Sequence, residues 1–183
     1  YKRQVLNGKC IDTSMGLTPL EGLPMGTRSG DIDPAIVQFV ANKEGKTVDE
    51  MLNILNKQSG MLAVSGKSSD FRDLNDGMDA GDERCTLALE LFAYKVAKYI
   101  GSYITALHGV DVIAFTAGVG ENDDIVRKLV MEYFDYMGIK IDLEENKKRG
   151  DDRYISTPDS SIKVVVIPTN EELRIARETL ELV

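Results

Sequence analysis

The sequence has no tryptophan, one histidine and two cysteines among its 183 residues. Cys10 and Cys85 are far apart and lack the CxxC spacing of a metal site or a redox pair. We therefore expect two buried thiols in a reducing compartment, without a disulfide. The single histidine, His108, comes without a suitable serine motif, so this chain cannot assemble a Ser-His-Asp triad. We expect His108 to be structural, near the end of a helix.

Long apolar runs and dense basic clusters are also absent. The run from Ile162 to Ile167 is far too short to cross a membrane. The first four residues lead into polar sequence rather than the apolar part of a signal peptide, so we expect a cytoplasmic protein with no membrane partner. The net charge is −8, and the one tight basic run, 147–149, lies beside Glu144 and Glu145. Nucleic acid is therefore not an expected partner, and an anionic ligand must be held by a few well-placed donors.

The composition is that of a globular domain, with 43% hydrophobic and 28% charged residues. The length fits one domain, or one domain and a fragment of another. Residues 1–14 are typical of the end of a β-hairpin, with Asn7-Gly8 as the turn and Lys9 to Thr13 as the returning strand. A chain that begins one strand before such a turn is expected to begin inside a fold, which indicates truncation.

The rest of the chain alternates between helical patterns and short apolar strands. The expected elements are a long loop over 15–33, a helix from Pro34 to Gly45 capped by Asp33, a helix from the Thr47–Glu50 capping box to Lys57, a Ser/Gly loop over 58–70, a helix from Asp82 to His108 ended by Gly109, a strand from Val110 to Thr116, a glycine turn, a helix from Asp123 to Met137, a strand from Lys163 to Ile167, and a helix from Asn170 to Leu182. Strands followed directly by helices predict an α/β fold that binds ligands at the carboxyl ends of its strands.

The loop over 15–33 is too long and too apolar to be either a plain connection or a disordered segment. Arg28 is its only basic residue, and a guanidinium is suited to phosphate or carboxylate oxygens. Gly26 and Gly30 would let a ligand approach the backbone. The alternative is an ion pair from Arg28 to Asp31 or Asp33, and residue chemistry alone does not decide between the two.

Two other segments have the residue types of a nucleotide site. The glycine-containing stretch 118–122 lies between a strand and a helix, where backbone N–H groups can meet a nucleotide, although a tight turn explains it equally simply. It lacks the third glycine of GxGxxG and the lysine of a P-loop. Asp70 could accept from a ribose hydroxyl and Arg72 could hold a base or a phosphate, whereas the simpler alternative is a helix cap and a surface arginine.

The segment after the last strand contains two adjacent carboxylates. Thr169 and Glu172 have capping-box spacing, so we expect Glu172 to fold back on the start of the last helix. Glu171 would then be available for Mg²⁺, which takes one or two protein carboxylates. The alternative for Glu171 is a favourable charge at a helix N-terminus.

Taken together, these segments resemble the acetate kinase family. The matching stretches are Asp12-Thr13-Ser14-Met15-Gly16, Thr18-Pro19-Leu20-Glu21-Gly22, Met25-Gly26-Thr27-Arg28-Ser29-Gly30-Asp31-Ile32-Asp33-Pro34, Ser65-Gly66, Asp70-Phe71-Arg72-Asp73, Phe115-Thr116-Ala117-Gly118-Val119-Gly120-Glu121-Asn122 and Pro168-Thr169-Asn170-Glu171-Glu172. Their order and spacing fit the family from about Gly8 to the end, whereas Tyr1 to Leu6 fit poorly.

The resemblance covers only the C-terminal half of family members and implies their fold. That fold is the α/β, ribonuclease-H-like domain of the actin, sugar-kinase and Hsp70 ATPase superfamily, in which two such domains flank a cleft. The implied boundaries are a residual hairpin over 1–14, a nucleotide-binding domain over 15–169, and a terminal helix over 170–183 that returns toward the missing N-terminal domain.

The resemblance also implies a reaction, the reversible phosphoryl transfer between ATP and acetate that gives acetyl phosphate and ADP with Mg²⁺, for which Mn²⁺ could substitute. By resemblance, Arg28 stabilises the transferring phosphoryl group, Pro19 forms a wall of the acetate methyl pocket, and Glu171 matches the magnesium ligand. The ATP-binding positions implied are Asp70, Phe71, Arg72, Gly118, Val119, Gly120, Glu121 and Asn122.

Three interpretations stay open at this point. The parent protein is an acetate kinase, or a propionate or butyrate kinase of the same family, since Pro19 is the only acyl-pocket wall implied here. In a different class, the chain is a catalytically incompetent module for nucleotide binding or dimerisation. The apolar helix expected from Asp82 to His108 would form a homodimer interface, as this domain does in the family. The isolated fragment is expected to be inactive.

Overall fold

The structure is a computed structural model that describes residues 3–182. Tyr1, Lys2 and Val183, at the outer ends of the expected ranges 1–14 and 170–183, lie outside the described residues. The chain divides into two compact units, Tyr1–Gly109 and Val110–Val183, which are described separately below. No helix in the described part of the chain is long and apolar enough to span a membrane.

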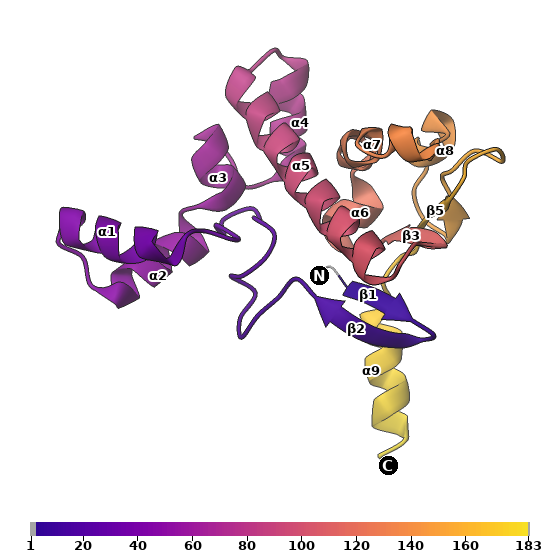
Figure 1. Ribbon diagram of the computed structural model, residues 1–183, viewed down its shortest axis with the longest axis horizontal. Helices are drawn as coiled ribbons and strands as arrows, with labels where there is room; N and C mark the ends of the chain where they lie inside the picture. Colours follow the sequence, from indigo (N-terminus) through magenta and orange to yellow (C-terminus); the bar gives the residue numbers. More distant parts are fainter. Residues whose placement is uncertain (1–2, 183) are drawn as a thin grey trace. The chain divides into compact units, whose positions relative to one another are not determined.

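The first unit opens with the expected β-hairpin. Strands β1 (Arg3–Leu6) and β2 (Lys9–Thr13) pair antiparallel and lie side by side in Figure 1. Asn7 and Gly8 connect them with φ values of 50° and 77°, the positive angles that a two-residue hairpin turn requires. All five residues of β2 are exposed. The hairpin prediction is therefore confirmed for the described residues.

Five helices follow among the described residues of the first unit. They are α1 (Pro34–Glu44), α2 (Val48–Lys57), α3 (Gly60–Ser65), α4 (Phe71–Asp79) and α5 (Glu83–Ala106). The predicted caps of α1 and α2 are confirmed, because the Asp33 side chain accepts from the Ala35 amide and Thr47 and Glu50 form a reciprocal capping box. Asp82 caps α5, which ends just before His108, a residue with a φ of 57°.

The expected Ser/Gly loop over 58–70 is wrong in part, because it contains α3. Its first residue, Gly60, has a φ of 60°, and Gly66 ends it in the left-handed region. Met61 inside this short helix is fully buried, so burial of its side chain stabilises a segment whose small residues suggested a loop.

The core of the first unit lies along one face of α5. The buried residues of this face are Cys85, Ala88, Leu89, Phe92, Ala93, Val96, Ala97 and Tyr103. Phe92 meets Phe71 of α4 edge to face, with ring centroids 4.7 Å apart. Both cysteines are free, as expected, but only Cys85 is buried. The expectation of a buried Cys10 is wrong, because Cys10 lies on β2, whose residues all face solvent.

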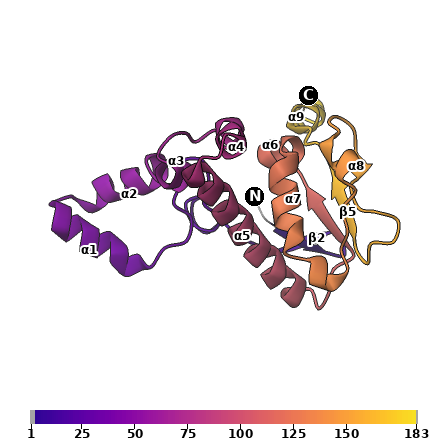
Figure 2. The ribbon, with the colours of Figure 1, turned by 90° about the horizontal axis from the view of Figure 1, so that it is seen from above.

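The second unit contains a small mixed sheet with helices. Its elements are β3 (Val112–Phe115), α6 (Ala117–Asn122), α7 (Asp124–Glu132), a 3₁₀ turn η1 (Asp135–Met137), α8 (Leu143–Lys147), β4 (Arg153–Tyr154), β5 (Lys163–Val166) and α9 (Glu171–Leu180). The strand order is β3-β5-β4, with β3 and β5 parallel and β4 antiparallel to β5. Figure 2 shows the helices α6, α7 and α8 of this unit together with the sheet that contains β5. The helices α6 to α8 lie in the crossover between the parallel strands, which confirms the α/β class.

Three details of the second unit correct the sequence predictions. The expected glycine turn over 118–122 is the short helix α6, and the expected helix over 123–137 is divided into α7 and η1. The last helix is capped by Asn170, whose side chain accepts from the Leu173 amide at 3.0 Å. The predicted capping box of Thr169 and Glu172 is therefore wrong, because the Thr169 hydroxyl bonds to Glu121 instead. The basic run is a solvated face as expected, with Lys147 and Lys148 paired to the neighbouring glutamates.

Candidate functional site

Arg28 lines a pocket of about 550 Å³ in the first unit. The pocket is formed by the loop before α1, by α2 and by the segment that precedes α4; its lining residues are Met25, Gly26, Thr27, Arg28, Leu52, Asn53, Asn56, Lys57 and Ser69. The loop is held in place by backbone bonds, since the Ser29 amide donates to Leu55 O at 2.9 Å and the Met61 amide to Met25 O at 2.9 Å. A Cβ on Gly26 would lie 2.8 Å from Ser69 O, so the loop and Ser69 are in close contact.

The guanidinium of Arg28 is not neutralised by a carboxylate among the described residues. Within residues 3–182, its side chain donates one hydrogen bond, from Nη1 to the Met25 sulfur at 3.6 Å. Asp31 instead accepts from the Gly22 amide at 2.8 Å and from the Tyr99 hydroxyl, while Asp33 caps α1. The alternative of an Arg28 ion pair with Asp31 or Asp33 is therefore wrong, because both carboxylates are engaged elsewhere. Arg28 is half-buried and Lys57 is exposed, so two positive charges line this pocket.

Asp70, Phe71 and Arg72 begin α4 in the same unit. Asp70 caps the helix, accepting from the Arg72 amide at 2.9 Å, and it also receives both Nε at 3.0 Å and Nη2 at 2.6 Å of the Arg72 side chain. This bidentate contact is the main reason that the pKa of Asp70 falls to about 2. Phe71 packs on Phe92, whereas the Arg72 side chain is 88% exposed. Arg72 is therefore the member of this segment that is most open to a ligand.

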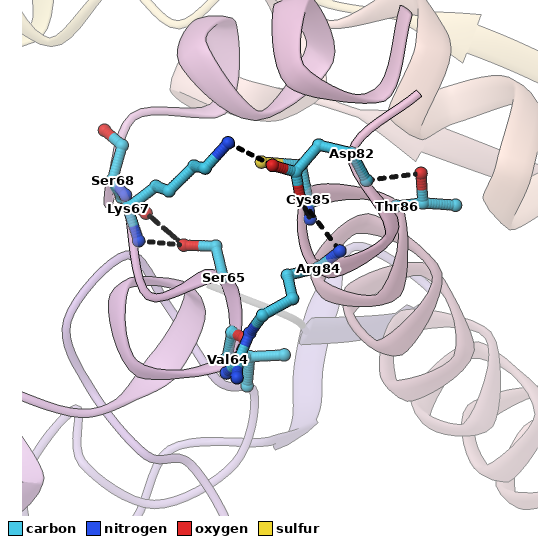
Figure 3. Close-up of polar contacts among 8 residues, drawn as sticks. All are labelled: Val64, Ser65, Lys67, Ser68, Asp82, Arg84, Cys85 and Thr86. Atoms are coloured by element: carbon cyan, nitrogen blue, oxygen red, sulfur yellow. Dashed lines mark hydrogen bonds and ion pairs between the residues drawn. The ribbon is translucent and has the colours of Figure 1, made fainter. Parts of the chain in front are cut away.

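A polar clamp that sequence reasoning missed holds the loop between α3 and α4 against the start of α5 (Figure 3). Lys67 pairs with Asp82, the N-cap of α5. Arg84 donates from Nε to Val64 O at 2.9 Å, so it caps the carbonyl end of α3. The Ser65 hydroxyl accepts from the Lys67 amide at 3.2 Å, which closes the loop on itself. The sequence predicted a helix that begins at Asp82, but it did not indicate the distant partners of Asp82 and Arg84.

Glu121, in the second unit, joins two segments that follow parallel strands. Its Oε1 accepts from the Ala117 amide at 2.6 Å, from the Thr169 amide at 2.7 Å and from the Thr169 hydroxyl at 2.8 Å. Partial burial raises the pKa of Glu121, and the hydrogen bonds from Thr169 and Ala117 outweigh it, so the net pKa is lowered. The sequence placed Glu121 in a nucleotide segment without indicating this contact.

Glu171 is the first residue of α9 and fits a magnesium ligand only as a single carboxylate. It is exposed and makes no hydrogen bond or ion pair within residues 3–182. The described residues contain no cluster of three His, Cys, Asp or Glu that could hold a metal. Mg²⁺ in phosphoryl-transfer sites is bound by one or two carboxylates together with substrate phosphates, so one free carboxylate is compatible with the ion.

The structure places the remaining predicted site residues in loops and in α6. Pro19 is half-buried in the loop before α1. Gly118, Val119 and Asn122 lie on α6, where the Asn122 amide donates to Gly118 O at 2.9 Å. Arg28, Pro19 and Asp70–Arg72 belong to the first unit, and Gly118–Asn122 and Glu171 to the second.

The fold is that of an α/β, ribonuclease-H-like domain of the actin, sugar-kinase and Hsp70 ATPase superfamily, as its match to solved structures of this class shows. A crystal structure of Porphyromonas gingivalis acetate kinase matches 96% of this chain and 44% of its own, with a TM-score of 0.90 and 46% identity. A propionate kinase structure from Francisella tularensis matches 96% of this chain and 45% of its own, with a TM-score of 0.89 and 43% identity.

Residues 3–177 match the profile of the acetokinase family, and the chain belongs to that family. It is 62% identical over 180 residues to an acetate kinase of Agathobacter rectalis, a match that covers 98% of this chain and 45% of that protein. The chain thus spans less than half the length of the curated relatives it matches.

Proposed function

We propose that the protein is an acetate kinase, which transfers a phosphoryl group reversibly between ATP and acetate, and that this chain is its C-terminal, nucleotide-binding half. The observation that carries the proposal is Arg28, a half-buried guanidinium that lines a 550 Å³ pocket without a carboxylate partner among the described residues. In a chain with a net charge of −8, an uncompensated cation in a pocket favours a local anion site.

The charge on a transferring phosphoryl group explains why Arg28 suits this chemistry. Phosphoryl transfer passes through a loose transition state with charge spread over the equatorial oxygens, and catalysis is mostly positioning and electrostatic stabilisation. Arg28 would donate to those oxygens from a loop that is already held by backbone bonds to α2 and α3. Glu171 would be a carboxylate ligand for Mg²⁺, which would supply positive charge to the substrate phosphates.

The nucleotide is assigned to two segments. Asp70, Phe71 and Arg72 supply one, in which the exposed Arg72 is the donor and Asp70 orients it. Residues 118–122 supply the other, on α6. Pro19 would form a wall of the acetate methyl pocket. Residues 15–169 would be the nucleotide-binding domain, preceded by the hairpin and followed by the terminal helix, in a cytoplasmic protein.

A propionate or butyrate kinase is the second candidate, because a solved propionate kinase matches this chain at 43% identity. The two candidates differ only in the acyl acceptor. A homodimer through α5 is proposed with either activity, since Leu87 and Tyr94 on this helix are 53% and 45% exposed. A chain that bound nucleotide or dimerised without catalysis would be the third outcome.

The deciding experiment measures acyl phosphate formation by the full-length protein with ATP and Mg²⁺. Acetate, propionate and butyrate are supplied separately, and kcat/KM is compared among them. The acetate kinase proposal requires the highest kcat/KM with acetate. A preference for the longer acids would select the second candidate, and the absence of turnover with all three in a folded dimer would select the third.

A further inference from the structure

The carboxylate of Glu121 connects the ends of two parallel strands in the second unit. Ala117 lies two residues beyond β3, and Thr169 lies three residues beyond β5. Glu121 Oε1 accepts hydrogen bonds from both, with donor–acceptor distances of 2.6 to 2.8 Å. We call these three residues the Glu121 junction. It joins positions 48 residues apart in sequence.

A second contact, made by α7, also fixes the helix that carries Glu121. Arg127 of α7 is 1% exposed and donates from Nη1 to Gly120 O at 2.9 Å. Its Nε donates to Asn146 Oδ1 at 2.7 Å, and the Asn146 side-chain amide donates to Asp124 O at 2.8 Å. A buried guanidinium bound mainly to carbonyl oxygens is costly to displace, so α6 has little freedom at Gly120.

The three hydrogen bonds indicate that the bonded carboxylate oxygen of Glu121 is engaged within the chain rather than by a nucleotide. An ionised carboxylate accepts strong hydrogen bonds, and here the same oxygen takes two amides and a hydroxyl of its own chain. The Ala117 amide, at the start of α6, is likewise occupied by this carboxylate rather than left for a nucleotide. Glu121 therefore belongs to the framework of the site, although it lies within the predicted nucleotide segment.

We propose that Glu121 is a positioning residue, which fixes Thr169, and with it the first turn of α9 and Glu171, relative to the nucleotide segment 118–122. This inference rests on the proposed function, because the roles of that segment and of Glu171 come from it. The physical reason is that displacements of about 1 Å between reacting groups can cost a hundredfold in rate. A metal carboxylate at the exposed start of a helix needs such a tether.

The first test is independent of enzymatic activity. Residue-resolved hydrogen exchange of the full-length, ligand-free protein is compared with that of Glu121→Ala, Glu121→Gln and the control Glu132→Ala, whose glutamate is exposed and pairs with Lys128 at 3.7 Å. Exchange at the Ala117 and Thr169 amides should accelerate at least about tenfold in Glu121→Ala, less in Glu121→Gln, and not in the control. Unchanged exchange in Glu121→Ala overturns the junction, whatever the protein does.

The second test asks whether the junction acts on the metal. Two quantities are measured for Glu121→Ala, Thr169→Val and the double variant. The first is the Mn²⁺ affinity in the presence of ADP, determined by electron paramagnetic resonance, and the second is KM for ATP. Each single change should weaken Mn²⁺ binding. The Mn²⁺ affinity of the double variant should be little lower than that of the single variant that binds Mn²⁺ more weakly. Effects that multiply would mean that the two residues act separately, which overturns the proposal.

The combined results separate the two levels of inference. If exchange accelerates while Mn²⁺ affinity and KM for ATP stay within about twofold, the junction is only structural and the positioning role is wrong. If the wild-type protein has no kinase activity, the proposed function fails and the metal role fails with it. The exchange result would still establish the junction in that case.

Discussion

At the scale of single residues, Arg28 is the most direct test of the proposed phosphoryl site. Arg28→Ala should lower kcat of the full-length enzyme by about 10² to 10³, or about 3 to 4 kcal/mol, as expected for a donor that meets charge developed in the transition state. KM for ATP should change much less. Arg28→Lys should recover only part of the rate, because an ammonium lacks the planar fork.

The steady-state kinetics of these variants are compared with those of a control variant, in which a basic residue outside the pocket is replaced. Lys43, an exposed residue in the last turn of α1, serves this purpose, and Lys43→Ala should leave both constants unchanged. An Arg28→Ala enzyme with wild-type kcat would mean that the guanidinium does not meet the transferring group.

The lowered pKa of Asp82 predicts that the free energy of unfolding depends on pH. The Lys67 ammonium, followed by the amides of Cys85 and Arg84, lowers the pKa of Asp82 from 3.8 to about 2. Because the folded-state pKa lies below the unfolded one, the charged carboxylate stabilises the native state above pH 3.8, and this contribution is lost as the pH falls through about 2. Asp82→Asn keeps the helix cap, since asparagine caps as well as aspartate, and removes the charge.

Melting temperatures measured from about pH 7 to about pH 2.5 check this expectation. Asp82→Asn should melt below the wild type at neutral pH, and the difference should shrink as the solution is acidified. Asp111→Asn is the control, because Asp111 is exposed and makes no hydrogen bond or ion pair within the described residues. A constant difference across the range would show that Asp82 stabilises α5 without its charge.

At the scale of elements, Gly60 and Gly66 at the two ends of α3 separate backbone strain from steric clash. Both have positive φ values, 60° and 68°. A Cβ on Gly60 would lie 2.1 Å from Met25 O and 2.6 Å from Arg28 O, whereas a Cβ on Gly66 meets nothing closer than 3.9 Å. Gly66→Ala should therefore cost about 1 kcal/mol of unfolding free energy from strain alone. Gly60→Ala should cost about 3 kcal/mol or more, because overpacking adds to it.

Denaturant unfolding of the two variants gives the comparison, and kcat gives a second readout. Gly60→Ala should also lower kcat, since the clash displaces the loop that carries Arg28, while Gly66→Ala should not. Equal losses of stability would mean that the loop before α1 does not pack on α3 as the structure describes.

The start of α9 provides a further contrast between neighbours. Asn170 bonds to the Leu173 amide, so Asn170→Ala should lower the local stability of the helix by about 1 kcal/mol, which is about fivefold faster amide exchange in α9. Glu172→Ala should have a smaller effect, because Glu172 does not close a capping box. Asn170→Asp should behave as the wild type. Faster exchange in Glu172→Ala than in Asn170→Ala would restore the sequence-based assignment.

The elements that sequence alone predicted are those whose signals are local. Asp33 and the Thr47–Glu50 box cap their helices through residues two or three positions away, so the pattern contains the whole interaction. Helix α3 was missed because its stability depends on the burial of Met61 among distant residues. The start of α9 was assigned wrongly because Thr169 bonds to Glu121, 48 residues earlier, instead of capping the helix.

The same distinction applies to the candidate site. Arg28 was selected from its residue type and its loop, but whether it had a carboxylate partner depended on where Asp31 and Asp33 point, which is a tertiary property. The clamp of Lys67 with Asp82 and the Glu121 junction join segments far apart in sequence, and no short motif encodes them. The resemblance supplied residue roles, whereas the structure supplies the contacts.

At the scale of the whole molecule, the chain matches 45% of the length of the A. rectalis acetate kinase. Ligand sites bury most of the surface of a small molecule, so a nucleotide held by only part of an enclosing cleft loses a large share of its contacts. The 183-residue chain by itself should therefore bind Mg-ATP at least about a hundredfold more weakly than the full-length protein, which corresponds to about 2.7 kcal/mol.

Isothermal titration calorimetry of both proteins with Mg-ATP measures this difference. The chain must first show a cooperative thermal transition, because an unfolded chain would bind weakly for a trivial reason. Arg72→Ala, tested in both the full-length protein and the chain, adds a site-specific control. If both proteins use the segment at the start of α4, this change should weaken Mg-ATP binding by the same factor in each. Equal affinity of the chain and the full-length protein would mean that these residues contain the complete nucleotide site, and the half-site argument would then be wrong.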